Sequence, residues 1–396
     1  MKRILIVGTA DTKGEELAYL DAVIQEAGAT PIVVDVGIGE PSGPIDIPRS
    51  QVAAARPDPA LQGSDRGKAV AAMGEAFESF VTKYAGFDAI LGIGGGGGTS
   101  IVTRGMRALP IGVPKLMVST LASGDVAPFV DVSDITMTPS ITDLAGLNSV
   151  SRTVLRNAAF AIIGMASAGA APAAEKPSLG LTMFGVTTPC VMRLVETLRD
   201  RYDCLVFHAT GTGGRAMEKL ADSDKLAGIV DVTTTEVCDL LVGGVLSAGP
   251  DRLGAVARTR LPYVGSCGAL DMVNFWGLES VPEKFRARKL HVHNPQVTLM
   301  RTTPEECRRI GAWIAEKLNA CEGPVRFLIP EKGVSALDIE GGAFFDEDAD
   351  AALFDALQDG LRTTPNRRLI RLPLHINDPA FSGALVENFL EIAVTA

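Results

Sequence analysis

The sequence is poor in aromatic side chains, which make up 5% of its 396 residues, and it contains only 4 histidines. Its 6 cysteines include no CxxC pair and follow no regular spacing, so neither a disulfide framework nor a cysteine-based zinc motif is expected. No apolar run reaches the roughly 18 residues that a membrane span requires. We therefore expect reduced thiols and no membrane partner.

The chain also lacks an excess of positive charge, with 37 basic against 47 acidic side chains and a formal net charge of -10. Proteins that bind nucleic acid usually concentrate Lys and Arg on one face, so no nucleic-acid partner is expected. Acidic residues interrupt the apolar N-terminus too soon for a secretory signal, which indicates a cytoplasmic protein. Small molecules are the expected partners, and a homo-oligomer is the default expectation for a metabolic α/β protein.

Apolar runs of strand length alternate with segments of helical period along the whole chain. The run at 2–8, for example, is followed by a helical pattern that ends at Gly28. An alanine- and proline-rich stretch at 171–178 interrupts the alternation, which restarts after it. Such alternation is typical of a mainly parallel sheet with helices on both faces. The sequence therefore predicts the α/β fold class, with two doubly wound, Rossmann-like domains and an interdomain cleft. These are a nucleotide-binding domain at 1–170, a linker at 171–178 and a second α/β domain at 179–396.

Five consecutive glycines occupy 94–98 within the stretch GIGGGGGTS, directly after an apolar run and before an amphipathic segment. A flexible spacer is usually flanked by polar or proline-rich sequence, which is not the case here. Glycines let a backbone approach a ligand closely, so that successive N–H groups and the next helix N-terminus point at an anion. We predict a phosphate-binding glycine loop with the candidate residues Gly95, Gly96, Gly97, Gly98 and Thr99.

Two known glycine motifs fit this stretch only in part. Gly92, Gly94 and Gly97 spell GxGxxG. The strand after a dinucleotide fingerprint should end in an acid, whereas the next apolar run here ends in Ser119 and Thr120. The stretch also spells a Walker loop in which glycine replaces the phosphate-binding lysine. A nicotinamide cofactor and a conventional P-loop are therefore disfavoured.

A phosphate site without its own lysine needs positive charge from elsewhere in the chain. Lys13 follows the first strand, which is normally central in such sheets, and Arg66 lies at the start of the helix before the glycine strand. Both are placed to reach one crevice at the carboxyl ends of the strands. The alternative is that each lies at a helix start in solvent.

Several uncommon motifs occur in order along the chain: GTADTKGEEL, GIGGGGGTS, TMFGVTTPC, LVFHATGTGGRAMEKL, GALDMVNF, QVTLMRTT and EKGVSALD. Together they resemble the ATP-binding family typified by the tomato mosaic virus resistance protein, over nearly all of the chain. The resemblance implies a two-domain α/β protein whose N-terminal domain holds ATP, with or without Mg²⁺. It places the nucleotide contacts on Asp11, Thr12, Lys13, the backbone near Ile38, Arg66 and Gly95 to Gly98.

Two features depart from the family pattern. A serine that is common in the family's glycine loop is Gly96 here, which keeps the backbone donors but removes a hydroxyl. The plant members carry a further TIM-barrel domain that we do not expect in this chain. Neither an activity that depends on that domain nor the antiviral role is expected here.

Three polar side chains follow predicted strands of the second domain, namely His208, Glu236 and Lys332. Loops after parallel strands meet at one edge of a sheet, so the three are candidates for general acid–base catalysis on a carboxylate or acyl substrate. Each residue also has an alternative role. His208 could be a buried core histidine, Glu236 a carboxylate favoured by a helix dipole, and Lys332 a solvated loop lysine. The glycines of GTGG at 211–214 open the next helix and form a second candidate anion site.

The spacing HVH would place His291 and His293 on one face of a strand, as in some metal sites. The sequence offers no matched third ligand, so no metal site is predicted.

Three functions stay open on this sequence. The first is an ATP-binding enzyme that acts on a small, anionic substrate. The second is a nucleotide-sensing protein without chemistry, in which ATP sets domain closure or oligomeric state. The third is a hydrolase or lyase whose glycine loop binds an anionic substrate in place of ATP.

Overall fold

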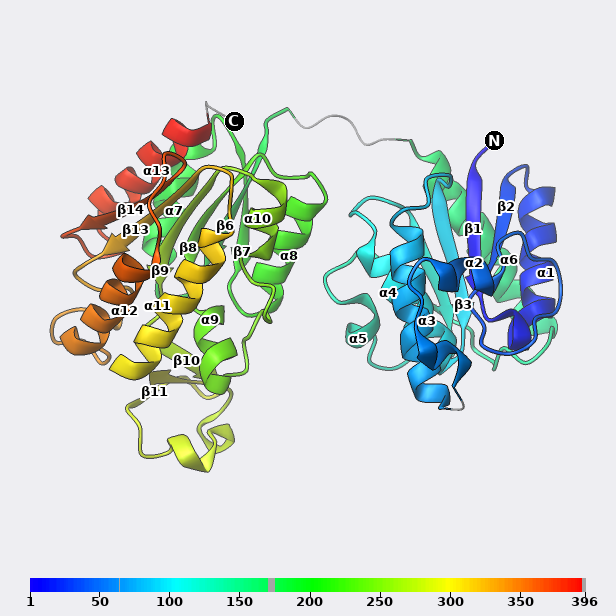
Figure 1. Cartoon of the computed structure of the whole chain (residues 1–396), viewed down its shortest axis with the longest axis horizontal. Helices are drawn as coiled ribbons and strands as arrows, with labels where there is room; N and C mark the ends of the chain where they lie inside the picture. The colour runs from blue at the N-terminus through cyan, green and yellow to red at the C-terminus, as the bar shows by residue number, and fades with distance from the viewer. Residues whose placement is uncertain (64, 170–174, 394–396) are drawn as a thin grey trace. The chain divides into compact units, whose positions relative to one another are not determined.

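The computed structural model describes residues 1–63, 65–169 and 175–393 of the chain (Figure 1). The chain divides into two compact units, Met1–Ala173 and Ala174–Ala396. In each unit helices cover a parallel sheet, so the predicted α/β fold class is confirmed. Among the described residues, no helix is both long enough and apolar enough to cross a membrane.

Half of the linker predicted at 171–178, the residues 171–174, lies outside the described ranges. The first strand of the second unit begins at its last residue, Ser178. The predicted linker boundaries therefore stay a prediction.

The N-terminal unit contains a five-stranded parallel sheet in the order β2-β1-β3-β4-β5. Its strands are β1 (Arg3–Gly8), β2 (Thr30–Asp35), β3 (Ala89–Gly94), β4 (Lys115–Ser119) and β5 (Thr136–Pro139). The central strands are nearly continuous apolar runs because both of their faces are buried. The strand order reverses between β1 and β3. Ligands of doubly wound folds bind beyond the carboxyl ends of the strands at such a switch point.

Helices cover both faces of this sheet (Figure 1). One face carries Ile4 and Ile6 and packs on α1 (Ala10–Glu26) and α6 (Ser149–Ser167). The other face, which carries Leu5 and Val7, packs on two helices, α3 (Arg66–Val81) and α4 (Gly96–Ala108). The shorter elements are α2 (Arg49–Ala54), α5 (Ala127–Val130) and the 3₁₀ turn Pro59–Gln62. This packing fixes the starts of α1, α3 and α4 at the sheet.

The second unit contains a six-stranded parallel sheet in the order β14-β13-β9-β8-β6-β7. Its strands are β6 (Ser178–Met183), β7 (Asp203–His208), β8 (Gly228–Thr233), β9 (Tyr263–Gly268), β13 (Val325–Pro330) and β14 (Arg367–Leu372). A smaller antiparallel sheet has the order β10-β12-β11 and consists of β10 (Met272–Phe275), β11 (Leu290–Asn294) and β12 (Val297–Arg301). The sequence reasoning did not anticipate this smaller sheet, because its strands are only four or five residues long.

The helices of the second unit again lie on both faces of the parallel sheet (Figure 1). Val230 faces α7 (Thr188–Leu198) and α13 (Pro379–Ala393), whereas Ile229 belongs to the core on the opposite face. The helices of that opposite face are α8 (Thr212–Asp222), α10 (Gly254–Thr259), α11 (Pro304–Asn319) and α12 (Glu347–Gly360). The short helix α9 (Glu236–Cys238) continues into the π turn Asp239–Gly243, and 3₁₀ turns occupy Leu278–Ser280 and Glu283–Phe285.

The predicted glycine loop is not a loop. Gly94 ends β3, Gly95 is the N-cap of α4, and the next three glycines form the first turn of that helix. Glycine disfavours helix by roughly 1 kcal/mol relative to alanine, and this preference is overridden here by the packing of Ile101 and Met106 on the sheet. The polar segment TADTKGE is also part of a helix, which begins at Ala10 and has non-helical backbone angles at Lys13. Both segments therefore start helices at the switch point.

Candidate functional site

A pocket of about 170 Å³ opens at the carboxyl edge of the five-stranded sheet, beside the switch point between β1 and β3. Its walls come from the first turns of α1 and α4, the segment after β2 and the start of α3. The lining residues are Thr9, Asp11, Thr12, Lys13, Val36, Ile38, Arg66, Val70, Gly95, Gly96, Gly97, Gly98 and Ile101. The structure thus brings together every residue predicted to contact a nucleotide except Thr99.

The first turn of α4 directs backbone N–H groups at this pocket. Its N-cap is Gly95, and in the described part of the structure no side chain caps the helix. By contrast, Asp65 caps the neighbouring helix α3 by accepting a hydrogen bond from the Lys68 N–H at 3.1 Å. A helix N-terminus carries partial positive charge, and its first N–H groups have no partner within the helix. The open start of α4 therefore has the donors of an anion-binding site.

Protein packing does not require glycine at the first turn of α4. A Cβ on Gly94 would lie 2.8 Å from the Thr99 nitrogen, so that position needs glycine for space. A Cβ on Gly97 or Gly98 would make ordinary contacts at 3.7 Å and 3.6 Å. Both residues have helical backbone without a positive φ, which alanine adopts more readily than glycine. The absence of side chains at these two positions keeps the helix start open to the pocket.

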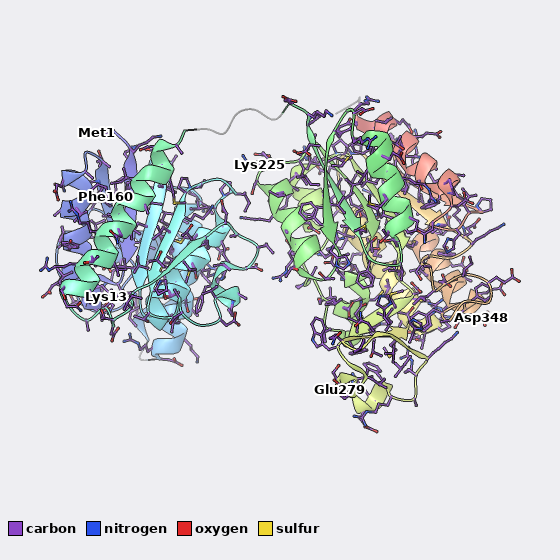
Figure 2. All side chains as sticks on the ribbon, turned by 180° about the vertical axis from the view of Figure 1, so that it is seen from behind. Met1, Lys13, Phe160, Lys225, Glu279 and Asp348 are labelled. Atoms are coloured by element: carbon purple, nitrogen blue, oxygen red, sulfur yellow. The ribbon has the colours of Figure 1, made fainter. Side chains whose placement is uncertain are left out.

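Lys13 and Arg66 bring positive charge to the pocket. Lys13 is half-buried and interrupts the helical backbone of α1 with φ -130° and ψ 22°. Figure 2 labels this residue at the start of α1. Arg66 is exposed and is the first residue of α3. The alternative interpretation placed both residues at helix starts in solvent. Both do lie at helix starts, and both also line the pocket.

Thr99 points away from the pocket and into the sheet. Its side chain is fully buried, and its Oγ1 shares a 2.7 Å hydrogen bond with Ser119 Oγ. The same hydroxyl donates to the Gly94 carbonyl oxygen at 3.3 Å. Thr99 therefore ties α4 to β3 and β4 in place of the predicted ligand contact.

A second, larger hollow adjoins the first and shares Ile38 with it. Its volume is about 690 Å³. Apolar side chains such as Met73 and Leu61 line much of it, together with the polar groups of Arg49 and Asp58. Both hollows lie along α3, where Val70 lines the first and Met73 lines the second.

The glycine-rich start of α8 differs from that of α4 because the protein itself closes it. Glu236 is fully buried, and its Oε1 accepts hydrogen bonds from the N–H groups of Gly211 at 2.7 Å and Gly214 at 3.0 Å. Its Oε2 pairs with Arg252 Nε at 2.8 Å. A carboxylate of the chain thus takes the position of an anion. The N–H groups predicted to bind an anion at 211–214 are thus occupied in part by Glu236. The catalytic role predicted for Glu236 stays a prediction, on a carboxylate that is engaged inside the core.

His208 and Lys332 lie at one edge of the six-stranded sheet but far apart along it. His208 ends β7 and Lys332 follows β13, with β6, β8 and β9 between them. Four strand spacings of about 4.8 Å separate them by roughly 19 Å. The His208 side chain is exposed and stacks on Phe184 at 5.3 Å, so it is not a buried core histidine, and Lys332 is exposed. The predicted catalytic residues therefore do not form a single site.

Comparisons with known proteins support the family resemblance that the sequence motifs indicated. Models of the N-terminal and C-terminal domains of an uncharacterised protein family, UPF0261, match residues 2–171 and 176–393. The chain belongs to the UPF0261 family. A UPF0261 protein of Rhizobium meliloti is 64% identical over 99% of this chain and 100% of its own length. The ToMV resistance protein Tm-1 of Solanum lycopersicum is 40% identical over 99% of this chain and 56% of the tomato protein.

The resemblance predicted from the motifs is thereby confirmed. Among solved structures, UDP-N-acetylglucosamine 2-epimerase from Rickettsia bellii is 10% identical, covers 100% of this chain and 97% of its own, and has a TM-score of 0.22. A score this low carries no argument about this UPF0261 chain.

Three motifs of the UPF0261 chain meet in one buried cluster in the second unit. Asp271 of GALDMVNF, Arg301 of QVTLMRTT and Asp338 of EKGVSALD are joined there by Asp350 of α12. Arg301 Nη2 lies 2.6 Å from Asp350 Oδ1 and 3.8 Å from Asp338 Oδ1. Burial raises the pKa of Asp271 and Asp338 to about 6 and that of Asp350 to about 7. One guanidinium thus serves three carboxyl groups that hold protons more tightly than usual.

This cluster predicts that stability falls as the pH rises. The folded state keeps protons up to a pH of about 6 to 7, whereas unfolded aspartates release them near a pKa of about 3.9. The folded state therefore binds more protons across this window, and the free energy of unfolding decreases with pH. We expect a decrease of about 2–4 kcal/mol between pH 5 and pH 8.

Urea denaturation of the wild type and of Asp350→Asn at both pH values measures this effect. The variant is expected to show a smaller decrease, because the amide cannot ionise. Equal pH dependence in the two proteins would contradict the role given to Asp350.

Within the described ranges, no group of three or more His, Cys, Asp or Glu side chains is arranged to hold a metal ion. His291 and His293 both lie on β11 with ring centroids 6.5 Å apart. The HVH spacing thus places both histidines on one strand, as the alternation of side chains along a strand predicts.

Two residues with buried, hydrogen-bonded side chains, Asp35 and Arg252, were not identified from the sequence. Asp35 ends β2, is fully buried and accepts hydrogen bonds from the N–H groups of Ala10 at 3.0 Å and Gly37 at 2.7 Å. Its signal was present, because an acid at the carboxyl end of a buried strand is placed at the ligand edge. The burial of Arg252 could not be predicted, because no local pattern shows that an arginine in a loop is buried.

Proposed function

We propose that the N-terminal unit of this UPF0261 chain binds ATP, with the phosphates at the open start of α4. The observation that carries the proposal is the pair Gly97 and Gly98, where alanine would fit the packed protein but would narrow the pocket. Backbone N–H groups and a helix dipole suit a phosphate group without a local lysine.

The charge around the pocket supports a polyphosphate. Lys13 and Arg66 reach the same 170 Å³ volume from two different helices. Two cations and an uncapped helix N-terminus suit a ligand with several negative charges better than a single carboxylate.

The adjoining hollow supports a nucleotide over inorganic polyphosphate. Its volume of about 690 Å³ falls in the usual range for small-molecule sites, and its lining is largely apolar. A base and a ribose would occupy this hollow while the phosphates reach past Ile38 to α4. The resemblance to an ATP-binding family favours adenine as the base.

No reaction is proposed for this chain. Glu236 is engaged inside the core, and the strand order separates His208 from Lys332. Binding without a built catalytic set favours the nucleotide-sensing function over the enzyme. A small anionic substrate, a homo-oligomer and a cytoplasmic location stay predictions.

Isothermal titration calorimetry with ATP tests this proposal. We expect Lys13→Ala and Arg66→Ala each to weaken ATP binding by about tenfold or more, because each removes one charge that faces the phosphates. Lys68→Ala is the matched control: its side chain lies two residues further along α3, is exposed and does not line the pocket. Unchanged affinity in both pocket variants, or an equal loss in the control, would contradict the site.

A further inference from the structure

Two buried carboxylate oxygens at the carboxyl edge of the five-stranded sheet have no hydrogen-bond partner among the described residues. They are Oδ1 of Asp11 and Oδ2 of Asp35. The second oxygen of each side chain is engaged: Asp11 Oδ2 accepts the Gly39 N–H at 2.7 Å, and Asp35 Oδ1 accepts the N–H groups of Ala10 and Gly37. A buried, unsatisfied carboxylate oxygen is costly, and most such groups have a partner. Each of these two oxygens can therefore accept a further partner, such as a cation or a water molecule.

The two carboxylates converge on Gly37. A Cβ on this residue would lie 2.9 Å from Asp35 Oδ1 and 3.0 Å from Asp11 Oδ1. The φ of Gly37 is not in the left-handed region, so its backbone does not require glycine. Of these two oxygens, Asp11 Oδ1 is unpartnered among the described residues, whereas Asp35 Oδ1 already accepts the N–H groups of Ala10 and Gly37. The missing side chain leaves the space between the two carboxylates open. A side chain there would fill that space.

The negative charge of Asp11 would oppose the binding of a phosphate in the pocket. Asp11 lines the same 170 Å³ volume as Lys13, Arg66 and the start of α4. A carboxylate repels a phosphate at short range, and the repulsion is strong where water is excluded. A divalent cation between the two reverses the sign of this interaction. Mg²⁺ is commonly held by one or two carboxylates together with substrate phosphates.

We propose that Asp11 and Asp35 form a Mg²⁺ site that joins the N-terminal unit to the phosphates of its nucleotide. The proposal rests on the proposed nucleotide binding for the phosphate ligands, while the two carboxylates belong to the chain itself. Two carboxylates are within the usual number of protein ligands for Mg²⁺, which keeps several of its waters. Phosphate oxygens and water complete the shell of such an ion.

The test uses two probes on the full chain. Mn²⁺, followed by electron paramagnetic resonance, reports cation binding without nucleotide. Calorimetry with ATP, in EDTA and in excess Mg²⁺, reports the coupling between the cation and the nucleotide. The variants are Asp11→Asn and Asp35→Asn, with Asp65→Asn as the control. Asp65 is an exposed N-cap next to Arg66, and asparagine replaces it well in that role.

We expect the wild type to bind Mn²⁺ and to bind ATP about tenfold tighter in Mg²⁺ than in EDTA. Asp11→Asn is expected to lose Mn²⁺ binding and the Mg²⁺ dependence, so that its ATP affinity is the same in EDTA and in Mg²⁺. Asp35→Asn is expected to lose Mn²⁺ binding while its amide oxygen still accepts the N–H groups of Ala10 and Gly37. A melting curve confirms that each variant is folded.

Two results would overturn the cation site. One is unchanged Mn²⁺ binding in both variants. The other is an equal loss of ATP affinity in EDTA and in Mg²⁺ for Asp11→Asn, which would make Asp11 a direct nucleotide contact. If no protein binds ATP but the two aspartates still hold Mn²⁺, the proposed function fails and the cation site stands.

Discussion

Replacing Gly97 and Gly98 together by alanine is expected to weaken ATP binding by about 100-fold or more. The new methyl groups would approach Val70 and Thr9, which line the pocket, and would displace a phosphate from the N–H groups of α4. The same change is expected to raise the free energy of unfolding by about 1 kcal/mol, because alanine is the better helix former and no neighbour lies closer than 3.6 Å. Calorimetry and thermal melting measure the two effects.

Gly164→Ala is the matched control for this double variant. Gly164 lies in α6, away from the pocket, and a Cβ there would have nothing within 4 Å. It is expected to gain stability without any change in ATP affinity. If the double variant binds ATP like the wild type, the open helix start is not the phosphate site. If it loses stability, the glycines serve packing after all.

Replacing Arg252 by methionine is expected to lower the free energy of unfolding by about 3–5 kcal/mol, a large share of the stability of a typical domain. Arg252 is buried and pairs with Asp231, Glu218 and Glu236 at 2.8 Å, 3.1 Å and 2.8 Å. Methionine fits the space approximately but leaves three buried carboxylates without their cation. Urea denaturation measures the loss.

Arg258→Met is the control for this effect. Arg258 lies in α10, forms ion pairs with Asp222 and Asp251 at 2.8 Å, and its side chain is 47% exposed. Exposed ion pairs contribute little, so a loss of less than about 1 kcal/mol is expected. Comparable losses in the two variants would show that burial does not determine how much the Arg252 ion pairs contribute to the free energy of unfolding.

The architecture was predictable because it depends on local pattern. Apolar runs of strand length and segments of helical period predict the two parallel sheets and their covering helices, although not the smaller antiparallel sheet of β10, β11 and β12. The clustering of Lys13, Arg66 and the glycines was also predictable, since the loops after parallel strands meet at one edge of the sheet. Both predictions depend only on the period of apolar residues in the sequence and on the handedness of α/β connections.

The errors came from interactions between distant residues. The sequence does not show that the Glu236 carboxylate is bonded to Gly211, Gly214 and Arg252, and its predicted catalytic role stays a prediction. The strand order places three strands between His208 and Lys332, and no local pattern encodes that order. Glycines in a row predicted a loop, whereas packing of the following residues continues the helix back to Gly96. Local preference decides such segments only where tertiary contacts are weak.

The central claim is that ATP binds at the switch point of the N-terminal unit, with its phosphates at the start of α4. Amide hydrogen exchange of the full chain, with and without ATP and Mg²⁺, tests it most directly because it reports every backbone N–H. We predict that ATP slows exchange in segments 9–14, 36–39 and 95–101, while segments 208–214 and 331–338 of the second unit stay unchanged. Protection confined to the second unit, or no protection at 95–101 under conditions in which ATP is bound, would contradict the claim.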